Sequence, residues 1–194
     1  VVPNIKHNEE MIHQNSRNLF FTGDNLEVLR HLQPGYENSI DVIYIDPPYN
    51  TGSDGFVYPD SFSHSDEKLK AMFGLDEEGL SRLKSIQGRA THSAWLTFMY
   101  PRLWLAKRLL KDTGVIFVSI DDNEQANLKL LMDEIFGEGQ FVGTIIHQRA
   151  KGGGQAKYVV KGHDIVNVYS KNISKMKPLL KPKNIQSETI TIDG

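Results

Sequence analysis

Apolar residues recur along this chain in two patterns, one typical of helices and one typical of buried strands. From residue 93 to residue 111 they fall at helical spacing and form one stripe along the predicted helix. At 39–45 and 115–120 they form short runs rich in β-branched and aromatic residues, as strands do. The predicted elements, in chain order, are a strand at 19–22, a helix at 25–32, a strand at 39–45, helices at 66–73, 76–86 and 93–111, a strand at 115–120, a helix at 124–136, strands at 141–147 and 165–170, and a weak strand at 189–192.

Strands that alternate with helices predict an α/β fold. The first strand, helix and strand are expected to form a parallel pair joined by a right-handed crossover, and Pro34 with Gly35 is expected to end that helix. Pro101 is expected to kink or break the helix at 93–111. The near-continuous apolar run at 115–120 predicts a strand that is buried on both faces.

The strand at 39–45 leads directly into Asp46, Pro47, Pro48 and Tyr49. Neither proline has an N–H to donate to a strand ladder, so the strand must end at Asp46. Ligands of open α/β sheets bind at the carboxyl ends of strands. Asp46 and Tyr49 therefore occupy a position where chemistry is expected.

This tetrapeptide offers two hydrogen-bond acceptors beside an aromatic ring. The Asp46 carboxylate and the Pro47 carbonyl suit the two hydrogens of an exocyclic amino group, and the Tyr49 ring suits the flat face of a heterocycle. Accepting both hydrogens localises the nitrogen lone pair and prepares it to attack an electrophilic methyl group. For the tetrapeptide alone, a simple strand-ending turn remains the alternative interpretation.

The tetrapeptide resembles the catalytic motif of the DNA amino-methyltransferases in its adenine-N6 form. The segments 18–26 (NLFFTGDNL), 46–52 (DPPYNTG), 93–96 (SAWL) and 114–124 (GVIFVSIDDNE) occur in the order expected for the modification (Mod) subunit of type III restriction–modification systems. This resemblance covers about residues 17–172. It implies the S-adenosylmethionine-dependent methyltransferase (Rossmann-like) fold, present here as an incomplete sheet with helices on both faces.

The resemblance also implies a reaction, namely methyl transfer from S-adenosylmethionine to adenine N6 in DNA, without a metal. It assigns the tetrapeptide 46–49 to catalysis and assigns Asp24, Asn25 and Asp46 to the cofactor, although Asp24 also fits a plain helix N-cap. The target base must leave the duplex, because its amino group is otherwise paired. The expected partners are double-stranded DNA, a second copy of the chain and a restriction (Res) subunit.

Enzymes of this kind resemble one another in a glycine-rich loop of the form F-x-G-x-G, and no such segment occurs in this sequence. The chain is therefore expected to be the N-terminal fragment of a longer subunit. Residues 1–172 are expected to begin the catalytic domain, with an inserted flap at 50–91, and residues 173–194 to begin a target-recognition region or linker. Such a piece alone is expected to bind the cofactor weakly and to be inactive.

Charge is uneven along the chain, although the net charge of its 194 residues is only −2. Residues 1–146 include 13 basic and 21 acidic residues, whereas residues 147–183 include nine basic residues and a single acidic one, Asp164. A basic block on an acidic body is typical of proteins that bind a phosphate backbone, and a solvated surface run is the alternative. The expected DNA-binding residues are Arg149, Lys151, Lys157 and Lys161.

Cysteine is absent, which excludes disulfides and thiolate–metal sites and fits a reducing cytoplasm. No apolar run in the sequence is long enough to cross a bilayer. Asp121 and Asp122 follow the strand at 115–120. N-capping of the next helix or a polar contact on the substrate side is favoured over metal binding, because no His or further carboxylate lies at useful ligand spacing.

Two other functions remain open and one is excluded. Methylation of cytosine N4 shares the same geometry, although the flanking segments favour adenine. A non-catalytic DNA-binding or assembly fragment is the second alternative. A nicotinamide-dependent oxidoreductase is excluded, because no G-x-G-x-x-G follows a strand.

Overall fold

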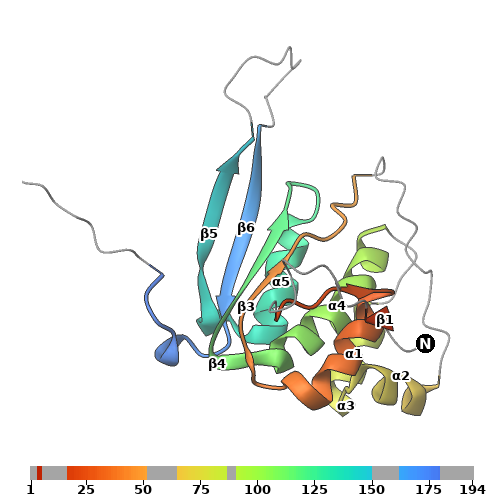
Figure 1. Ribbon diagram of the computed structural model, residues 1–194. Helices are drawn as coiled ribbons and strands as arrows, with labels where there is room; N and C mark the ends of the chain where they lie inside the picture. Colours follow the sequence, from red (N-terminus) through yellow and green to blue (C-terminus); the bar gives the residue numbers. More distant parts are fainter. Residues whose placement is uncertain (1–3, 6–16, 52–64, 87–90, 150–161, 180–194) are drawn as a thin grey trace, which may run out of the picture.

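The computed structural model describes residues 4–5, 17–51, 65–86, 91–149 and 162–179, which form an α/β fold (Figure 1). The main sheet has four strands in the order β3-β4-β6-β5, and β1 pairs with β2 in a separate two-stranded sheet. The strands are β1 (Asn4–Ile5), β2 (Phe21–Thr22), β3 (Ile40–Ile45), β4 (Leu110–Ile120), β5 (Phe141–Gln148) and β6 (His163–Ser170). The helices are α1 (Asn25–Tyr36), α2 (Asp66–Phe73), α3 (Glu77–Ile86), α4 (Thr91–Leu109) and α5 (Gln125–Phe136), with short 3-10 turns η2 (Glu138–Gln140) and η3 (Ile173–Lys175). The weak strand predicted at 189–192 lies outside the described residues.

The main sheet combines one parallel and two antiparallel pairings. β3 and β4 are parallel, whereas β6 runs antiparallel to both of its neighbours, β4 and β5. Because β4 lies inside the sheet, Ile116, Val118 and Ile120 are fully buried. The predicted burial of the strand at 115–120 is therefore confirmed.

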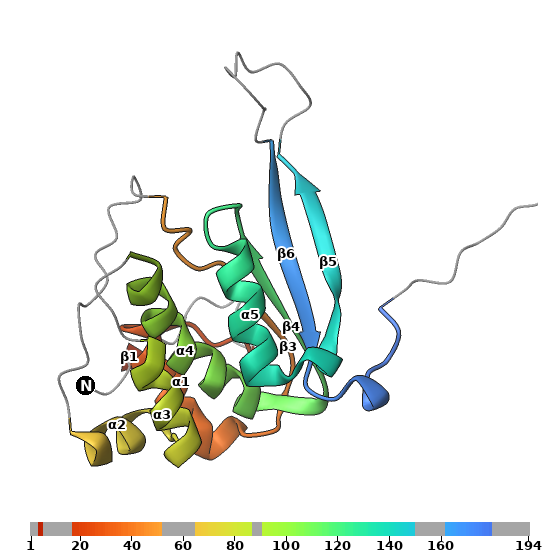
Figure 2. The same cartoon turned by 180° about the vertical axis from the view of Figure 1, so that it is seen from behind.

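One face of the sheet is covered by α4 and α5, and α1, α2 and α3 pack around α4 (Figures 1 and 2). The core between these layers is apolar and includes Trp95 of α4, Leu128 of α5 and Ile116 of β4. On the opposite face of β3, Val42 and Tyr44 are 60% and 63% exposed. The second helical layer that the resemblance implies is not among the described residues.

The predicted parallel pairing of the first two strands is wrong. β2 has two residues, pairs antiparallel with β1, and is not part of the sheet that contains β3. Leu19 and Phe20, which the prediction placed in the strand, are 49% and 69% exposed. A strand of two residues makes too few ladder hydrogen bonds and buries too little apolar surface to join the main sheet.

Pro34, expected to end a helix, and Pro101, expected to kink or break one, both lie inside helices. α1 continues through Pro34 and α4 continues through Pro101, so the predicted helix end at Pro34 and Gly35 is wrong. Each proline removes one intrahelical donor. Near Pro34 the side-chain amide of Gln33 donates to the carbonyls of Leu29 and Leu105. These bonds and the packing of α1 against α4 outweigh the local preference of proline.

β4 begins at Leu110, directly after α4, rather than at residue 115. Leu110 pairs with Ile40 and Val115 pairs with Val42, which leaves residues 111–114 outside the regular register. Gly114 lies in this bulge, where an added Cβ atom would come 3.0 Å from the carbonyl oxygen of Ile40. Such a close backbone approach admits glycine and disfavours larger residues.

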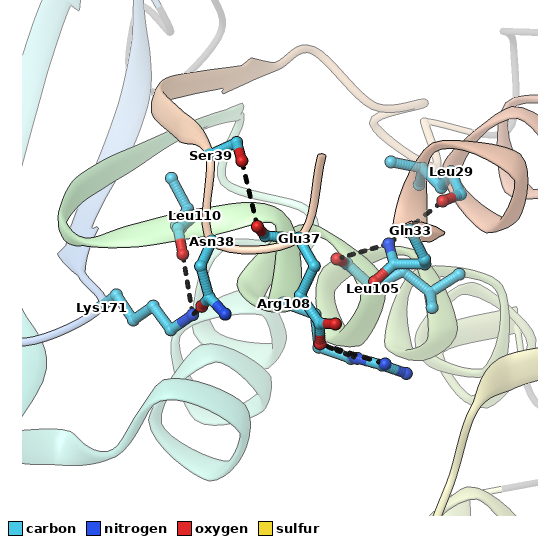
Figure 3. Close-up of polar contacts among 9 residues, drawn as sticks. All are labelled: Leu29, Gln33, Glu37, Asn38, Ser39, Leu105, Arg108, Leu110 and Lys171. Atoms are coloured by element: carbon cyan, nitrogen blue, oxygen red, sulfur yellow. Dashed lines mark hydrogen bonds and ion pairs between the residues drawn. The ribbon is translucent and has the colours of Figure 1, made fainter. Parts of the chain in front are cut away.

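Polar contacts fix the turn from α1 into β3 (Figure 3). Asn38 has a φ of 54°, and its N–H donates to the carbonyl of Arg108, near the end of α4, at 3.0 Å. Lys171, directly after β6, donates from Nζ to the carbonyl of Leu110 at 2.7 Å. These contacts hold the turn before β3 against the end of α4 and the start of β4.

Tyr169 of β6 is fully buried, and its hydroxyl donates to Oδ1 of Asp133 on α5 at 2.6 Å. Burial, reinforced by the Asp133 carboxylate, raises the pKa of Tyr169 above its ordinary value of 10. The folded protein therefore holds this proton more tightly than the unfolded chain does. Its contribution to stability is present below the ordinary pKa and is lost as the pH rises through the alkaline range.

We therefore expect Tyr169→Phe to flatten the alkaline loss of stability. Urea unfolding of the native protein and of Tyr169→Phe, compared between about pH 9 and about pH 11, measures this difference. Parallel losses of stability in the two proteins would contradict the expectation.

Candidate active site at the carboxyl end of β3

The tetrapeptide that begins with Asp46 follows the last residue of β3, as predicted. Asp46 is exposed, Pro47 is buried, and the Tyr49 side chain packs partly against the core. The Tyr49 hydroxyl donates to Oδ1 of Asp46 at 2.9 Å. Partial burial raises the pKa of Tyr49 above its ordinary value of 10, and the Asp46 carboxylate adds to this effect. The phenol therefore keeps its proton and remains a hydrogen-bond donor.

Trp95 holds the diproline from the side of α4. Its ring is fully buried, and Nε1 donates to the carbonyl of Pro48 at 2.7 Å. The sequence pattern predicted Trp95 as a residue of the apolar helical stripe and missed this bond. The sequence could indicate only that Nε1 would need some acceptor, because a buried tryptophan N–H usually finds one.

The start of α1 is held by a second residue of α4. Asp24 is the N-cap of α1, because its Oδ1 accepts from the N–H groups of Leu26 at 3.0 Å and Glu27 at 3.2 Å. Arg102 donates from Nε to Oδ1 of Asn25 at 2.7 Å, and its Nη2 lies 3.7 Å from Oδ2 of Asp24. Burial lowers the pKa of Arg102 to about 10, and Asp24 opposes this shift. The N-cap interpretation of Asp24 is confirmed, and sequence reasoning missed Arg102.

The start of α1 and the end of β3 lie on the same side of the sheet. Figure 1 shows α1 and β3 running in opposite directions, which places both points toward that side. α4 connects them, since Trp95 binds the tetrapeptide and Arg102, about two helical turns later, binds the start of α1. Two carboxylates are thus positioned at the end of the molecule where β3 ends.

A fully buried carboxylate, that of Glu124, lies behind the tetrapeptide at the start of α5. Its Oε1 accepts from the side-chain amide of Asn50 and lies 2.6 Å from Nδ1 of His92. Its Oε2 accepts from the amide of Asn127 at 2.7 Å. The sequence pattern indicated Glu124 as the first residue of a helix and gave no signal that it meets His92.

Asp121 closes a turn between β4 and α5 instead of capping the helix, so of its two predicted roles N-capping is wrong and a polar contact on the substrate side stays a prediction. Its carboxylate accepts from the backbone N–H of Asn123 at 2.9 Å and from the side-chain amide of the same residue at 2.7 Å. The residue before α5 is Glu124, which makes no capping bond with its side chain.

Among the described residues, no group of three or more His, Cys, Asp or Glu side chains is arranged to hold a metal. None of the described helices combines the length and the apolar character that a bilayer span requires.

Of the predicted DNA-binding residues, Arg149 directly follows β5, at the end of the hairpin formed by β5 and β6. Arg149 is described, and its Nε lies 3.2 Å from Oδ1 of Asp164. Lys151, Lys157 and Lys161 lie outside the described residues. The Asp164 carboxylate also contributes to the raised pKa of Tyr49. Ile45 pairs with Val118 and Ile165 pairs with Ile120, so the end of β3 and the start of β6 lie at the same edge of the sheet.

A cavity of about 370 Å³ lies elsewhere, among α1, the end of α2 and α4, and its lining includes Arg30, Gly74 and Arg108. No residue of the tetrapeptide lines it. Arg108 contacts the turn that precedes β3, so this cavity lies toward the opposite end of the strand from Asp46. The candidate site is therefore located by the chemistry of residues 46–49 and not by this cavity.

The chain belongs to the DNA methylase family, because the N6_N4_Mtase family model matches residues 40–191. Among solved structures, the cytosine-N4-specific PvuII DNA methyltransferase is similar with a TM-score of 0.50 and 13% identity, over 78% of this chain and 48% of that chain. At this identity the likeness shows the fold alone. The predicted methyltransferase fold with an incomplete α/β sheet is confirmed, and of the helices predicted on both faces the described residues supply those on one face.

Two proteins that are similar to this chain in sequence are type III modification subunits. The chain is 67% identical over 151 residues to the Mod subunit of the type III restriction–modification enzyme StyLTI from Salmonella typhimurium, and 46% identical over 169 residues to the EcoPI Mod subunit of Escherichia phage P1. These matches cover 78% and 86% of this chain but 23% and 26% of the relatives. The predicted resemblance is confirmed, and the chain spans about a quarter of the length of these relatives.

Proposed function

We propose that this chain is the N-terminal part of a type III modification subunit that transfers a methyl group from S-adenosylmethionine to adenine N6 in DNA. The observation that carries the proposal is the exposed Asp46 carboxylate, bonded to Tyr49 at the end of β3. In this proposal residues 1–172 begin the catalytic domain and residues 50–91 are an insertion in it. Residues 173–194 begin a target-recognition region or linker.

The acceptors of the tetrapeptide have separate tasks. Because the Tyr49 hydroxyl binds Oδ1 of Asp46, we assign Oδ2 to one amino hydrogen of a flipped-out adenine. The Pro48 carbonyl is bonded to Trp95, so we assign the Pro47 carbonyl to the other hydrogen. Both bonds strengthen as positive charge develops on the amino nitrogen, which stabilises the transition state. Asp46 is also placed to accept the proton that this nitrogen loses.

The cofactor assignment rests on the charge of the groups present. S-adenosylmethionine, when bound, supplies an electrophilic methyl group on a positively charged sulfur, and exposed carboxylates such as Asp24 and Asp46 suit such a cation. Oδ1 of Asp24 already caps α1, and Oδ1 of Asn25 already accepts from Arg102. We therefore assign Oδ2 of Asp24 and the amide NH2 of Asn25 to the cofactor.

The DNA backbone is assigned to the basic hairpin end, with Arg149, Lys151, Lys157 and Lys161 as its phosphate contacts. The strand pairing supports this, because the start of β6 and the end of β3, which Tyr49 follows, lie at the same edge of the sheet. Self-association, a restriction (Res) subunit as partner and a cytoplasmic location complete the proposal.

Tyr49→Ala is expected to weaken capture of the flipped base, because the stacking ring is lost. Stacking of a base on an aromatic side chain contributes about 1–3 kcal/mol, so we expect affinity for the extruded base to fall by about 5- to 150-fold. With 2-aminopurine at the target position, the fluorescence that reports extrusion should drop in Tyr49→Ala. Tyr49→Phe keeps the ring and is the control, and equal signals from the two variants would contradict the stacking role.

The reaction itself is tested on the full-length protein with DNA and S-adenosylmethionine, followed by mass spectrometry of the nucleosides. N6-methyladenine is the expected product. N4-methylcytosine would instead establish the cytosine alternative, and the absence of any methylated nucleoside would favour a non-catalytic DNA-binding or assembly role.

A further inference from the structure

We infer that Glu124 is a positioning residue of the proposed methyl-transfer site, because its buried carboxylate holds both ends of the segment that joins the tetrapeptide to α4. Asn50, at the start of this segment, directly follows Tyr49, and His92, at its end, lies in the first turn of α4. Both bind the same oxygen, Oε1 of Glu124. The inference rests on the proposed function for its catalytic consequence, whereas the contacts themselves do not.

The first link is the one to the tetrapeptide. Asn50 has a φ of 57°, in the left-handed region that non-glycine residues seldom adopt. Its side-chain amide donates to Oε1 of Glu124. This bond ties down the residue at which the backbone turns, so it also limits where the neighbouring Tyr49 can place its ring.

The second link runs to α4. A carboxylate oxygen only accepts hydrogen bonds, so Nδ1 of His92, 2.6 Å away, carries the hydrogen. The imidazole is 62% exposed whereas the carboxylate is fully buried, so the bond runs from the surface into the interior. Trp95, which holds the Pro48 carbonyl, follows less than one helical turn later. Glu124 therefore holds the turn of α4 that also positions the diproline.

The Glu124 carboxylate is held in place because its second oxygen, Oε2, also accepts a hydrogen bond. Oε2 accepts from Asn127, which lies on α5 and not on the segment. Leaving a buried carboxylate with fewer donors is unfavourable, so the three donors hold Glu124 in one orientation. The two ends of the segment are thereby fixed against α5, and through it against the sheet.

Three variants of the full-length protein separate positioning from folding. Glu124→Ala removes the acceptor for both segment ends. Glu124→Gln keeps Oε1 as an acceptor for Asn50 and His92, and Asn127 can reverse its amide to accept from the new NH2 group. Asn127→Ala is the matched control, because it removes a bond to the same carboxylate but leaves both segment ends attached.

The first measurement is amide hydrogen exchange in peptides that cover residues 46–51 and 91–96. We expect faster exchange at both ends in Glu124→Ala and native exchange in Glu124→Gln and Asn127→Ala. The second measurement is steady-state methylation. A displacement near 1 Å at a reacting centre reduces rates by about 100-fold, so we expect Glu124→Ala to lower kcat by about that factor while KM for DNA stays near its native value. Glu124→Gln should recover most of the turnover.

Native exchange at both segment ends in Glu124→Ala would overturn the inference, whatever the activity. Faster exchange with unchanged kcat would equally overturn the positioning role. If the native protein methylates no DNA, the proposed function fails, and the exchange data still decide whether Glu124 holds the segment. Should Glu124→Ala not fold, His92→Ala changes an exposed side chain and should release the 91–96 end alone; native exchange there would contradict the inference.

Discussion

Replacing Asp46 with alanine is expected to reduce methylation by the full-length protein by about 10³-fold while leaving its affinity for DNA nearly unchanged. The substitution removes the acceptor that stabilises developing positive charge on the target nitrogen, and loss of one such preorganised group costs about 10²- to 10³-fold in turnover. Asp46 is exposed, so the change leaves the core intact. Turnover is measured by transfer of labelled methyl groups and affinity by titration of labelled DNA.

Asp41→Ala is the matched control for this experiment, because Asp41 is an exposed carboxylate near the start of β3. It pairs with Nζ of Lys111 at 2.8 Å, far from the carboxyl end of β3. Surface ion pairs contribute about 0–1 kcal/mol, so this variant should keep native turnover and near-native stability. Native turnover by Asp46→Ala would end the proposed mechanism, and an equal loss in Asp41→Ala would show that the effect is not specific to the site.

Replacing Trp95 with alanine is expected to give the largest loss of stability. Trp95 is fully buried, and truncating a buried tryptophan to alanine costs about 3–5 kcal/mol. Trp95→Phe keeps most of the apolar volume but leaves the buried side of the Pro48 carbonyl without its donor, which costs about 1–3 kcal/mol. Because the diproline then loses its anchor, Trp95→Phe should also lower turnover. Urea unfolding followed by circular dichroism and the methylation assay measure the two effects.

The other tryptophan of the chain provides the control. Nε1 of Trp104 is buried and has no hydrogen-bond partner within the described residues. Removing a donor that has no acceptor relieves an unfavourable burial, so Trp104→Phe should lose less stability than Trp95→Phe and keep its turnover. Equal losses in the two phenylalanine variants would show that the bond from Trp95 to Pro48 contributes nothing beyond apolar packing.

Local patterns in the sequence predicted most elements well. The helix at 66–73 and the strands at 39–45, 141–147 and 165–170 agree with the structure to within two residues at each end. Where a prediction failed at a proline, tertiary packing outweighed the local preference of the residue. Pro34 was expected to end its helix, but the packing of α1 and α4 against each other outweighed the missing donor. α4 does not break at Pro101, and the kink expected there stays a prediction.

The sequence by itself determined where β3 stops and which groups stand beyond it, because a proline pair cannot continue a strand ladder whatever surrounds it. It also determined the family, through motifs whose order is readable without coordinates. Only the tertiary structure decided what holds these groups in place. Trp95 meets Pro48 across 47 positions, and Glu124 meets Asn50 across 74. Periodicity shows which face of a helix is buried, but which polar atom that face will meet depends on how distant segments pack.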